Sequence, residues 1–497
     1  MSTYQFVALL LVVIGPVLAL AKSTGAPPSL VLFGVGLAST ALPCLPPLRV
    51  DPQLVLNLFL PPLVYASTVR VSWHLLRFTL VPGVVVGAVT VIATVALVAG
   101  AARILLLPGI SWIAALLLGV VASVFDTRLF HEAQGRPHVP RAITDTLKAR
   151  ELVARLFILA TFALVVENAG SNTPTALAVA EHYAFDIPAG LLVGVLIGRA
   201  VAFMRQQIDP APIEIAVSIM TPYAASLAAT ALEVSGVAAI TAAALVISTV
   251  RINRRTGAPI SSSEARISAV AFWEEVSLIT SSALFLLAGR TLPEALAGLG
   301  EWPLSQLLLA AAAVLLVVLA VQLALSYVTV LRQPIAGALA AAQPRGATRW
   351  AAAAIMAWSS TRSVIGLVIA LSIPAALPDG AAFPERDLIL VVTALVILGS
   401  VLLQGLTLRA FVQRSGLQGE AEQQREEETA RRVMETANAS PGRDHANGFD
   451  SARHALLRLR ERNEIGDEVL VSMLRETDLT SRATEGDALP GAGPPNP

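Results

Sequence analysis

The sequence predicts an all-α polytopic membrane protein, with about 13 transmembrane helices and a small cytoplasmic helical tail. Apolar residues make up 55% of the chain, charged residues only 14%, and the mean hydropathy is +0.69. A water-soluble surface cannot accommodate this composition. One helix needs roughly 20 apolar residues to cross the hydrocarbon layer, and residues 5–414 are a succession of such runs. We therefore exclude a soluble enzyme and expect no enzymatic activity.

Thirteen apolar runs follow one another, each ending at a charged or Gly/Pro-marked connection. Their length favours helices over a β-barrel. The first run lacks a basic n-region and an A-x-A-like cleavage site, so we interpret it as a retained helix and not as a signal peptide. The runs begin near Tyr4, Ser29, Leu54, Phe78, Trp112, Lys148, Ile187, Ile213, Gly236, Ser268, Leu304, Trp350 and Asp387.

The Lys and Arg residues of the short loops predict the orientation. With thirteen spans and a cytoplasmic C-terminus, inner loops hold about three times as many of these residues as outer loops, as the positive-inside rule requires. The outer loops hold Arg49, Arg103, Arg290 and Arg386. We therefore expect a multi-pass protein of the cell (inner or plasma) membrane, with its N-terminus outside.

The chain changes character after Arg414, which divides it into a transmembrane domain, 1–414, and a cytoplasmic tail, 415–497. Residues 420–435 form a charged helical run, and residues 439–442 are a helix breaker. Two short amphipathic helices predict a hairpin at about 451–480, ahead of a disordered Gly- and Pro-rich end. Their apolar residues are Ala455, Leu456, Leu459, Val469, Leu470, Met473 and Leu474. The hairpin is interpreted either as a regulatory or dimer contact or as a solvated appendage.

Several other classes of function find no support in the sequence. The single Cys44 excludes an internal disulfide, and the six histidines have no metal-ligand spacing. We expect no metal, no cofactor and no nucleic-acid partner.

Ionisable residues inside the spans are the candidate functional residues, because each costs at least about 2.5 kcal/mol on insertion scales. Asp126 lies about 14 residues, roughly 21 Å, into the fifth span. Arg155 lies in the sixth span and Arg362 in the twelfth. For Arg155 the alternative is an i,i+4 ion pair with Glu151 near the cytoplasmic face. For Asp126 it is a purely structural ion pair.

Two polar stretches interrupt apolar helices at corresponding places in the two halves of the chain. They are residues 123–127 and the Ser/Thr cluster around Arg362. Broken helices from inverted repeats that meet near the midplane form the ion site of many secondary transporters. Asp126 and Arg362 would neutralise opposite helix-dipole ends there, the negative charge at N-termini and the positive charge at C-termini.

Four ordered motifs resemble one known family. The first is Asn57-Leu-Phe-Leu-Pro-Pro-Leu-Val-Tyr65, and the second is Thr221-Pro-Tyr223 followed by Val234-Ser-Gly-Val-Ala238. The third is Phe272-Trp-Glu274 with Leu284-Phe285 and Gly289, and the fourth is Leu403-Gln-Gly-Leu-Thr407. Together they resemble the NhaP/NHE-type monovalent cation:proton antiporters over nearly the whole chain.

The resemblance implies thirteen helices in a dimerisation domain and a core domain, with the fifth and twelfth helices broken and crossing. It implies a homodimer in the lipid bilayer that exchanges sodium, potassium or lithium for protons by elevator-like alternating access.

The same alignment places the departures from the family at its ion site. Asp126 and Arg362 are kept, but the cation-binding Asp of the sixth helix falls on Arg155 and its Asn on Ala154. The tenth-helix Asn falls on Ser281. In the family, a Glu of the sixth helix pairs with an Arg of the eleventh helix. In this sequence the Glu falls on Arg150, directly before Glu151, and the Arg falls on Gln322.

Arg155 therefore conflicts with the usual mechanism, in which protons and cations compete for one carboxylate. Arginine stays protonated and presents only donors. Like charges about 4 Å apart cost roughly 4 kcal/mol at an effective dielectric near 20. We therefore expect Arg155 to pair with Asp126 and sodium to bind weakly. Cation:proton exchange is the leading function, and the alternatives are a transport-deficient or sensory homologue and a carrier of a different, anionic substrate.

Overall fold

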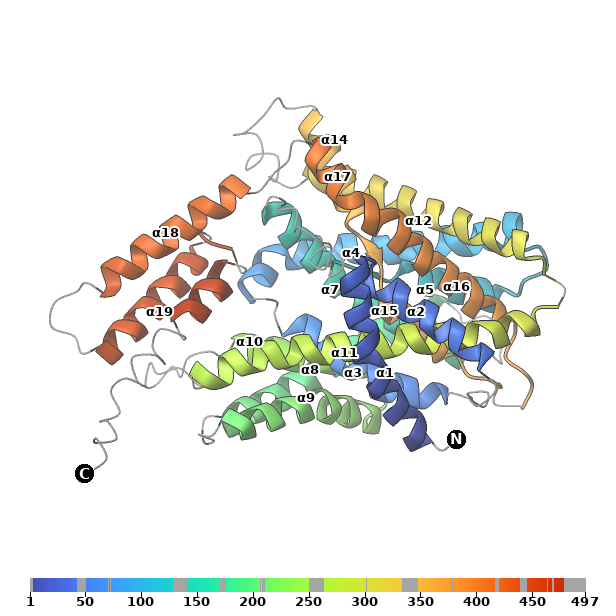
Figure 1. The fold of residues 1–497 in the computed structure, drawn as a ribbon, viewed down its shortest axis with the longest axis horizontal. Helices are drawn as coiled ribbons and strands as arrows, with labels where there is room; N and C mark the ends of the chain where they lie inside the picture. The colour runs from blue at the N-terminus through green and yellow to red at the C-terminus, as the bar shows by residue number, and fades with distance from the viewer. Residues whose placement is uncertain are drawn as a thin grey trace.

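The computed structural model is a bundle of long helices with a smaller group of helices, α18 and α19, at one end (Figure 1). It describes residues 3–477 apart from 43–50, 70, 72, 128–138, 140, 170–175, 206, 208–210, 250–262, 301, 333–346, 378–379, 416–419, 439–444, 463 and 467–468.

The first half of the chain contains seven α-helices among its described residues and one short strand. They are α1 (Thr3–Thr24), α2 (Pro28–Ala38), α3 (Pro52–Thr68), α4 (Trp73–Ala101), α5 (Trp112–Ser123), β1 (Phe125–Asp126), α7 (Arg141–Glu167) and α8 (Ala176–Arg205). A 3₁₀ turn, Ser39–Ala41, follows α2, and a π-helical turn, Ala102–Leu106, follows α4.

The second half repeats the pattern of a helix, a short strand and a helix. Its elements are α9 (Ala211–Ala231), α10 (Gly236–Thr249), α11 (Ser263–Gly298), α12 (Leu304–Arg332), α14 (Ala347–Trp358), β2 (Thr361–Arg362), α15 (Val364–Leu371), α16 (Arg386–Ser400), a π-helical turn Val401–Gly405, α17 (Leu406–Ser415), α18 (Glu420–Asn438) and α19 (His445–Glu461).

Each of the thirteen predicted runs falls on a helix. The largest boundary difference is at α8, which begins at Ala176 and not near Ile187, because the helix extends beyond the apolar run into polar sequence. Six helices in the described part of the chain are both long and apolar enough to span a membrane: Gly83–Leu106, Tyr183–Arg205, Pro212–Ala231, Ala271–Gly298, Leu304–Leu331 and Arg386–Ser415. Four apolar helices are shorter, among them the first half of a broken helix, Trp112–Ser123.

Local sequence signals fix where several helices begin. The Asp51 side chain accepts a hydrogen bond from the Gln53 N–H (3.0 Å), and Pro52 occupies the first position of α3. Ser111 caps α5, and the Glu385 carboxylate in turn accepts hydrogen bonds from the Ser111 hydroxyl (2.7 Å) and N–H (3.2 Å). The starts of α5 and α16 are thereby tied together.

Two glycines let α2 and α11 pack with their backbones in contact. A Cβ atom built on Gly36 would lie 2.1 Å from the Leu286 carbonyl oxygen, and one built on Gly289 would lie 2.1 Å from the Phe33 carbonyl oxygen. Small residues allow such close approach between membrane helices. The contact fixes the distance between α2 and α11, both of which line the site described below.

We expect Gly36→Ala to destabilise the protein by about 1–3 kcal/mol, since the added methyl group has backbone and no flexible side chain to displace. The measurement is thermal unfolding of the purified protein in detergent. Gly34→Ala is the matched control, because a Cβ atom at Gly34 meets nothing within 4 Å on the same helix. Equal unfolding temperatures for the two variants would show that the α2–α11 contact is not tight.

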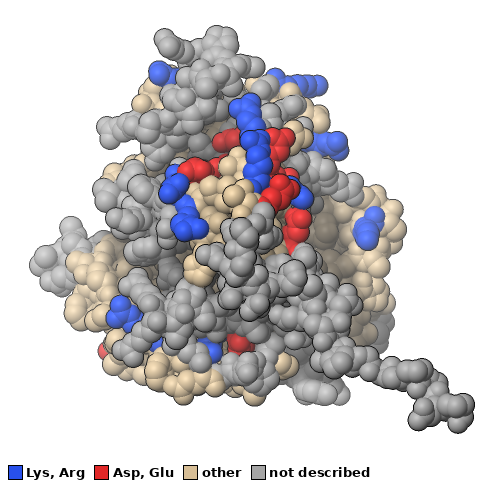
Figure 2. Space-filling model, turned by 90° about the vertical axis from the view of Figure 1, so that its left-hand side faces the viewer, with Lys and Arg blue, Asp and Glu red and all other residues tan. Residues whose placement is uncertain are grey.

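The tail residues pack into a small core of their own. Ala430 of α18 lies with Leu456 and Leu459 of α19 and with Val469 and Met473 of the following helical segment, 469–477. Acidic and basic side chains are interspersed on this end of the molecule (Figure 2). The predicted disordered end, 478–497, lies outside the described residues, and the domain boundary at 414 stays a prediction.

Candidate functional site

The two predicted helix breaks meet in the structure. Strands β1 and β2 pair antiparallel, with Phe125 opposite Arg362 and Asp126 opposite Thr361. The Thr361 hydroxyl donates to the Asp126 carbonyl oxygen (2.9 Å), and the Ser363 N–H donates to the Val124 carbonyl oxygen (3.4 Å). The meeting of the two breaks, expected from the polar interruptions, and the crossing of the fifth and twelfth helices, implied by the family resemblance, are therefore confirmed.

Arg362 neutralises the carbonyl ends of two half-helices. Its guanidinium donates to the carbonyl oxygen of Ala122 in the last turn of α5 (2.7 Å) and to that of Ser360 just after α14 (2.6 Å). Its own backbone N–H donates to the Ser400 hydroxyl (2.9 Å). A positive charge is stabilised at helix C-termini, so the arginine holds both breaks in place.

Asp126 lies at the opposite kind of helix end. The Ser363 hydroxyl is 3.4 Å from Oδ2 of Asp126 and accepts a hydrogen bond from the Ile365 N–H (3.1 Å), which makes Ser363 the N-cap of α15. A carboxylate is stabilised at a helix N-terminus. Asp126 is only 4% exposed, so the helix end replaces part of its lost hydration.

Asp126 and Arg362 line a cavity of about 40 Å³ between the crossing, α2 and α11. About 10–15 Å³ is enough for one water, so the cavity can hold a small ion with some hydration. Ser281, the position of the family's tenth-helix Asn in the alignment, is among the residues that line it. Ser29 of α2 and Ser282 of α11 also line the cavity, and the sequence analysis missed them. The one signal in the sequence that could have identified them is a serine within an otherwise apolar helix.

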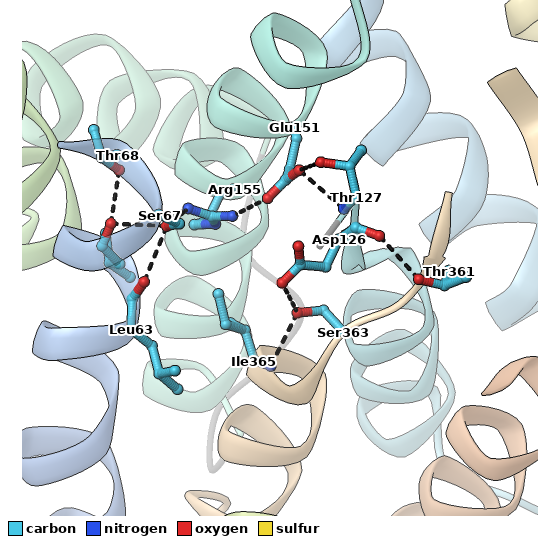
Figure 3. A network of polar contacts seen from close by, with 11 residues as sticks. Leu63, Ser67, Thr68, Asp126, Thr127, Glu151, Arg155, Thr361, Ser363 and Ile365 are labelled. Carbon is cyan, nitrogen blue, oxygen red and sulfur yellow. Dashed lines mark hydrogen bonds and ion pairs between the residues drawn. The ribbon is translucent and has the colours of Figure 1, made fainter. Parts of the chain in front are cut away.

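Arg155 pairs with Glu151 and not with Asp126, so the expected Asp126–Arg155 ion pair is wrong. Its guanidinium contacts the Glu151 carboxylate and donates to the Ser67 hydroxyl of α3 (2.5 Å). The i,i+4 spacing places both charges on one face of α7. Figure 3 shows Arg155 between Ser67 and Glu151, with the Asp126 carboxylate directed to Ser363.

The Glu151–Arg155 pair is also buried, so it is not a surface pair at the cytoplasmic face. The two side chains are 9% and 4% exposed. Glu151 additionally accepts hydrogen bonds from the N–H (3.2 Å) and the hydroxyl (2.9 Å) of Thr127, directly after β1. The pair thereby links α3 and α7 to the helix crossing.

The remaining candidates lie outside the Asp126 cavity. Ala154 is fully buried in the main hydrophobic core. Arg150 donates to the hydroxyls of Ser326 (3.2 Å) and Ser360 (2.8 Å) and lies over the Phe125 ring, 5.0 Å from its centroid. Gln322, one turn before Ser326 on α12, is fully buried, and its amide has no hydrogen-bond partner within the described residues. Arg150 therefore reaches α12 at Ser326, and no Arg150–Gln322 pair forms.

Two broken helices that cross inside an apolar bundle, with one buried charge of each sign at the breaks, define the fold of an ion-transporting secondary transporter. The sodium/hydrogen exchanger transmembrane family model matches residues 7–414. The chain belongs to that family and is an integral multi-pass membrane protein.

Several known proteins are similar to this chain. An uncharacterized Na(+)/H(+) exchanger of Mycobacterium tuberculosis is 31% identical over 407 residues, covering 81% of this chain and 72% of the relative. The Na(+)/H(+) antiporter ApNhaP of Aphanothece halophytica is 25% identical, covering 80% of this chain and 70% of the relative. The solved sodium proton antiporter MjNhaP1 of Methanocaldococcus jannaschii matches with a TM-score of 0.60 at 15% identity, covering 84% and 99% of the two chains.

Proposed function

We propose that the protein is a secondary transporter that exchanges a monovalent cation, sodium or potassium, for protons across the cell membrane. The observation that carries the proposal is the cavity in which the Asp126 carboxylate lies among the hydroxyl-bearing residues Ser29, Ser281 and Ser282. Oxygen ligands suit hard cations. Family membership supports the same activity.

In this mechanism a proton and a cation compete for Asp126, and the competition couples the two fluxes. Serine hydroxyls would replace part of the hydration shell of the cation. Arg155 does not block this binding, because Glu151 compensates its charge and its side chain is not among those that line the cavity. The expectation of weak sodium binding rested mainly on the positive charge of Arg155, and that argument no longer holds. The positive charge of Arg362 still lies at the cavity wall.

The rest of the cycle follows the family pattern as part of the same proposal. The protein works as a homodimer by elevator-like movement of the core, with its N-terminus outside and its tail in the cytoplasm. The loop charges support this orientation.

The test is a pH-gradient assay in everted vesicles that contain the wild-type protein. We expect sodium or potassium chloride to dissipate a preformed gradient, and we expect the same cation to do so as its gluconate salt. No response to any cation would favour the transport-deficient or sensory alternative. A response that follows the anion and not the cation would favour the anion carrier.

The hydroxyl-bearing residues lead to a separate prediction. We expect Ser282→Ala to raise the sodium concentration for half-maximal exchange several-fold, since losing one neutral ligand costs about 1 kcal/mol, with the maximal rate changed less. Ser305→Ala, at an exposed position of α12, is the control. An unchanged half-maximal concentration in Ser282→Ala would remove this hydroxyl from the proposed cation site.

A further inference from the structure

The motif Leu403-Gln-Gly-Leu-Thr407 lies beside the break of the twelfth helix. Its first three residues belong to the π-helical turn Val401–Gly405, which packs against β2. Single π-helical turns inside α-helices occur frequently at functional sites. Gln404 is the polar residue of this turn, and its side chain is fully buried. A buried amide needs hydrogen-bond partners, and the partners of Gln404 show what the motif holds.

Both ends of the Gln404 amide reach the break. Its Nε2 donates to the carbonyl oxygen of Trp358 (3.0 Å), the last residue of α14. Its Oε1 accepts a hydrogen bond from the hydroxyl of Ser400, which is also fully buried. The oxygen of that hydroxyl in turn accepts from the backbone N–H of Arg362 (2.9 Å). One side chain thereby connects the end of α14 with the arginine of the break.

The guanidinium of Arg362 closes these bonds into a ring. It donates to the carbonyl oxygen of Ser360 (2.6 Å), while Gln404 donates to that of Trp358. The last carbonyl groups of a helix have no partner within it, so the two side chains together satisfy the C-terminal end of α14. Arg362 is therefore held relative to α14 twice, through its guanidinium and, by way of Ser400 and Gln404, through its backbone.

The position of Arg362 determines what surrounds Asp126. The residue before it, Thr361, pairs with Asp126 between β2 and β1. The residue after it, Ser363, has its hydroxyl 3.4 Å from Oδ2 of Asp126. A shift of the chain at Arg362 moves both neighbours relative to the carboxylate, and a binding site works only while its supporting residues keep its geometry. Gln404 is not among the described residues that line the cavity, so it acts on the site through the break.

We propose that Gln404 is a positioning residue of the ion site, which holds the break of the twelfth helix in the geometry that cation binding requires. The inference rests on the proposed exchange activity and adds to it a residue outside the cavity. Gln404 acts through Ser400 and Trp358 and does not itself contact the cation.

The test is the cation concentration for half-maximal exchange in everted vesicles, measured with sodium and with potassium. Gln404→Met keeps the length of the side chain but removes both hydrogen-bonding groups. We expect it to raise the half-maximal concentration about 2- to 10-fold, as for the loss of one hydrogen bond, with the maximal rate per protein changed less. An unchanged half-maximal concentration would overturn the proposal, because a merely structural role changes the amount of folded protein and not its affinity.

Ser400→Ala interrupts the same connection at its other member. We expect a rise of similar size, and we expect the double variant with Gln404→Met to be no worse than the more affected single variant, because both residues act through one chain of hydrogen bonds. Effects that simply add would overturn the proposal, since the two residues would then act independently. If Gln404→Met does not reach the membrane, Ser400→Ala decides.

Thr407 provides the matched control, because it also binds Trp358. Its hydroxyl accepts from the indole Nε1 of Trp358 (2.9 Å) and donates to the Leu403 carbonyl oxygen of the preceding turn. Thr407→Val therefore removes one hydrogen bond to Trp358 and leaves the ring through Ser400 intact. We expect its half-maximal concentration to match that of the wild type. An equal rise in Thr407→Val and Gln404→Met would overturn the proposal, because any loosening of Trp358 would then have this effect.

Amide hydrogen exchange separates this inference from the proposed activity. It is followed by mass spectrometry on peptides that contain residues 358–363 of the purified protein, and it requires no transport. We expect faster exchange in Gln404→Met and Ser400→Ala than in wild type and Thr407→Val, because the break opens more often once the Arg362 N–H loses its held acceptor. If the wild type moves no cation, the proposed function fails, and amide exchange alone decides whether Gln404 holds the break. Equal amide exchange in all four proteins would overturn the inference.

Discussion

Asp126→Asn is expected to abolish cation-dependent proton movement in everted vesicles, which is the largest single effect that the structure predicts. The amide keeps the size of the side chain but loses both the negative charge and the ability to exchange a proton. Among the described residues that line the cavity, Asp126 is the one carboxylate. Nothing else there can alternate between a proton and a cation.

Arg362→Ala is expected to abolish transport as well, for a different reason. Without the guanidinium, the carbonyl oxygens of Ala122 and Ser360 lose their shared donor, and the two breaks lose their compensating charge. Glu294→Gln, at an exposed position of α11, serves as the control for both variants. All proteins are compared at equal membrane abundance. Full exchange by either Asp126→Asn or Arg362→Ala would remove that residue from the transport site.

Arg155→Gln is expected to lower the stability of the protein by about 3–5 kcal/mol, because it leaves the Glu151 carboxylate buried with its cation removed. Glu151→Gln leaves the opposite charge alone and is expected to cost a similar amount. The double variant Glu151→Gln with Arg155→Gln removes both charges together. We expect it to recover much of the loss, since neither buried charge is then left without its partner. The measurement is the thermal unfolding of all four proteins.

The tail provides a matched control for this pair. Arg432 and Glu428 of α18 have the same i,i+4 spacing but are 75% and 66% exposed. The corresponding variants there are expected to change stability by no more than about 0.5 kcal/mol, because water screens an exposed pair. Single variants of Glu151 and Arg155 that cost as little as those at Arg432 would mean that water reaches the buried pair.

The two predictions also separate the two parts of the site. Asp126 and Arg362 line the cavity, so their loss is expected to act on transport. Glu151 and Arg155 connect α3 and α7 to the crossing through Ser67 and Thr127, so their loss is expected to act first on stability. The sequence alignment placed Arg155 at the cation site. The structure instead makes it a link between helices.

The sequence by itself determined the membrane class, the order of the helices and the two breaks. These are local properties of the chain. A sufficiently long apolar run forms a helix in lipid. A run of polar residues such as 359–363 interrupts such a helix whatever its neighbours are. The depth of Asp126 in its span is likewise a matter of counting along the chain. Even the charges that neutralise the broken ends follow from the direction of the helix dipole.

The tertiary structure decided which charges meet. The sequence offered two carboxylates, Asp126 and Glu151, as partners for Arg155. Only the packing of α3, α7 and the crossing shows that the partner is Glu151. Ser29 entered the cavity because Gly36 and Gly289 bring α2 against α11, a contact between segments about 250 residues apart in sequence. Hydropathy is a property of one segment, whereas a pairing energy falls steeply with the distance between side chains on different helices. That distance is set by packing, and packing is not encoded in the periodicity of any single span.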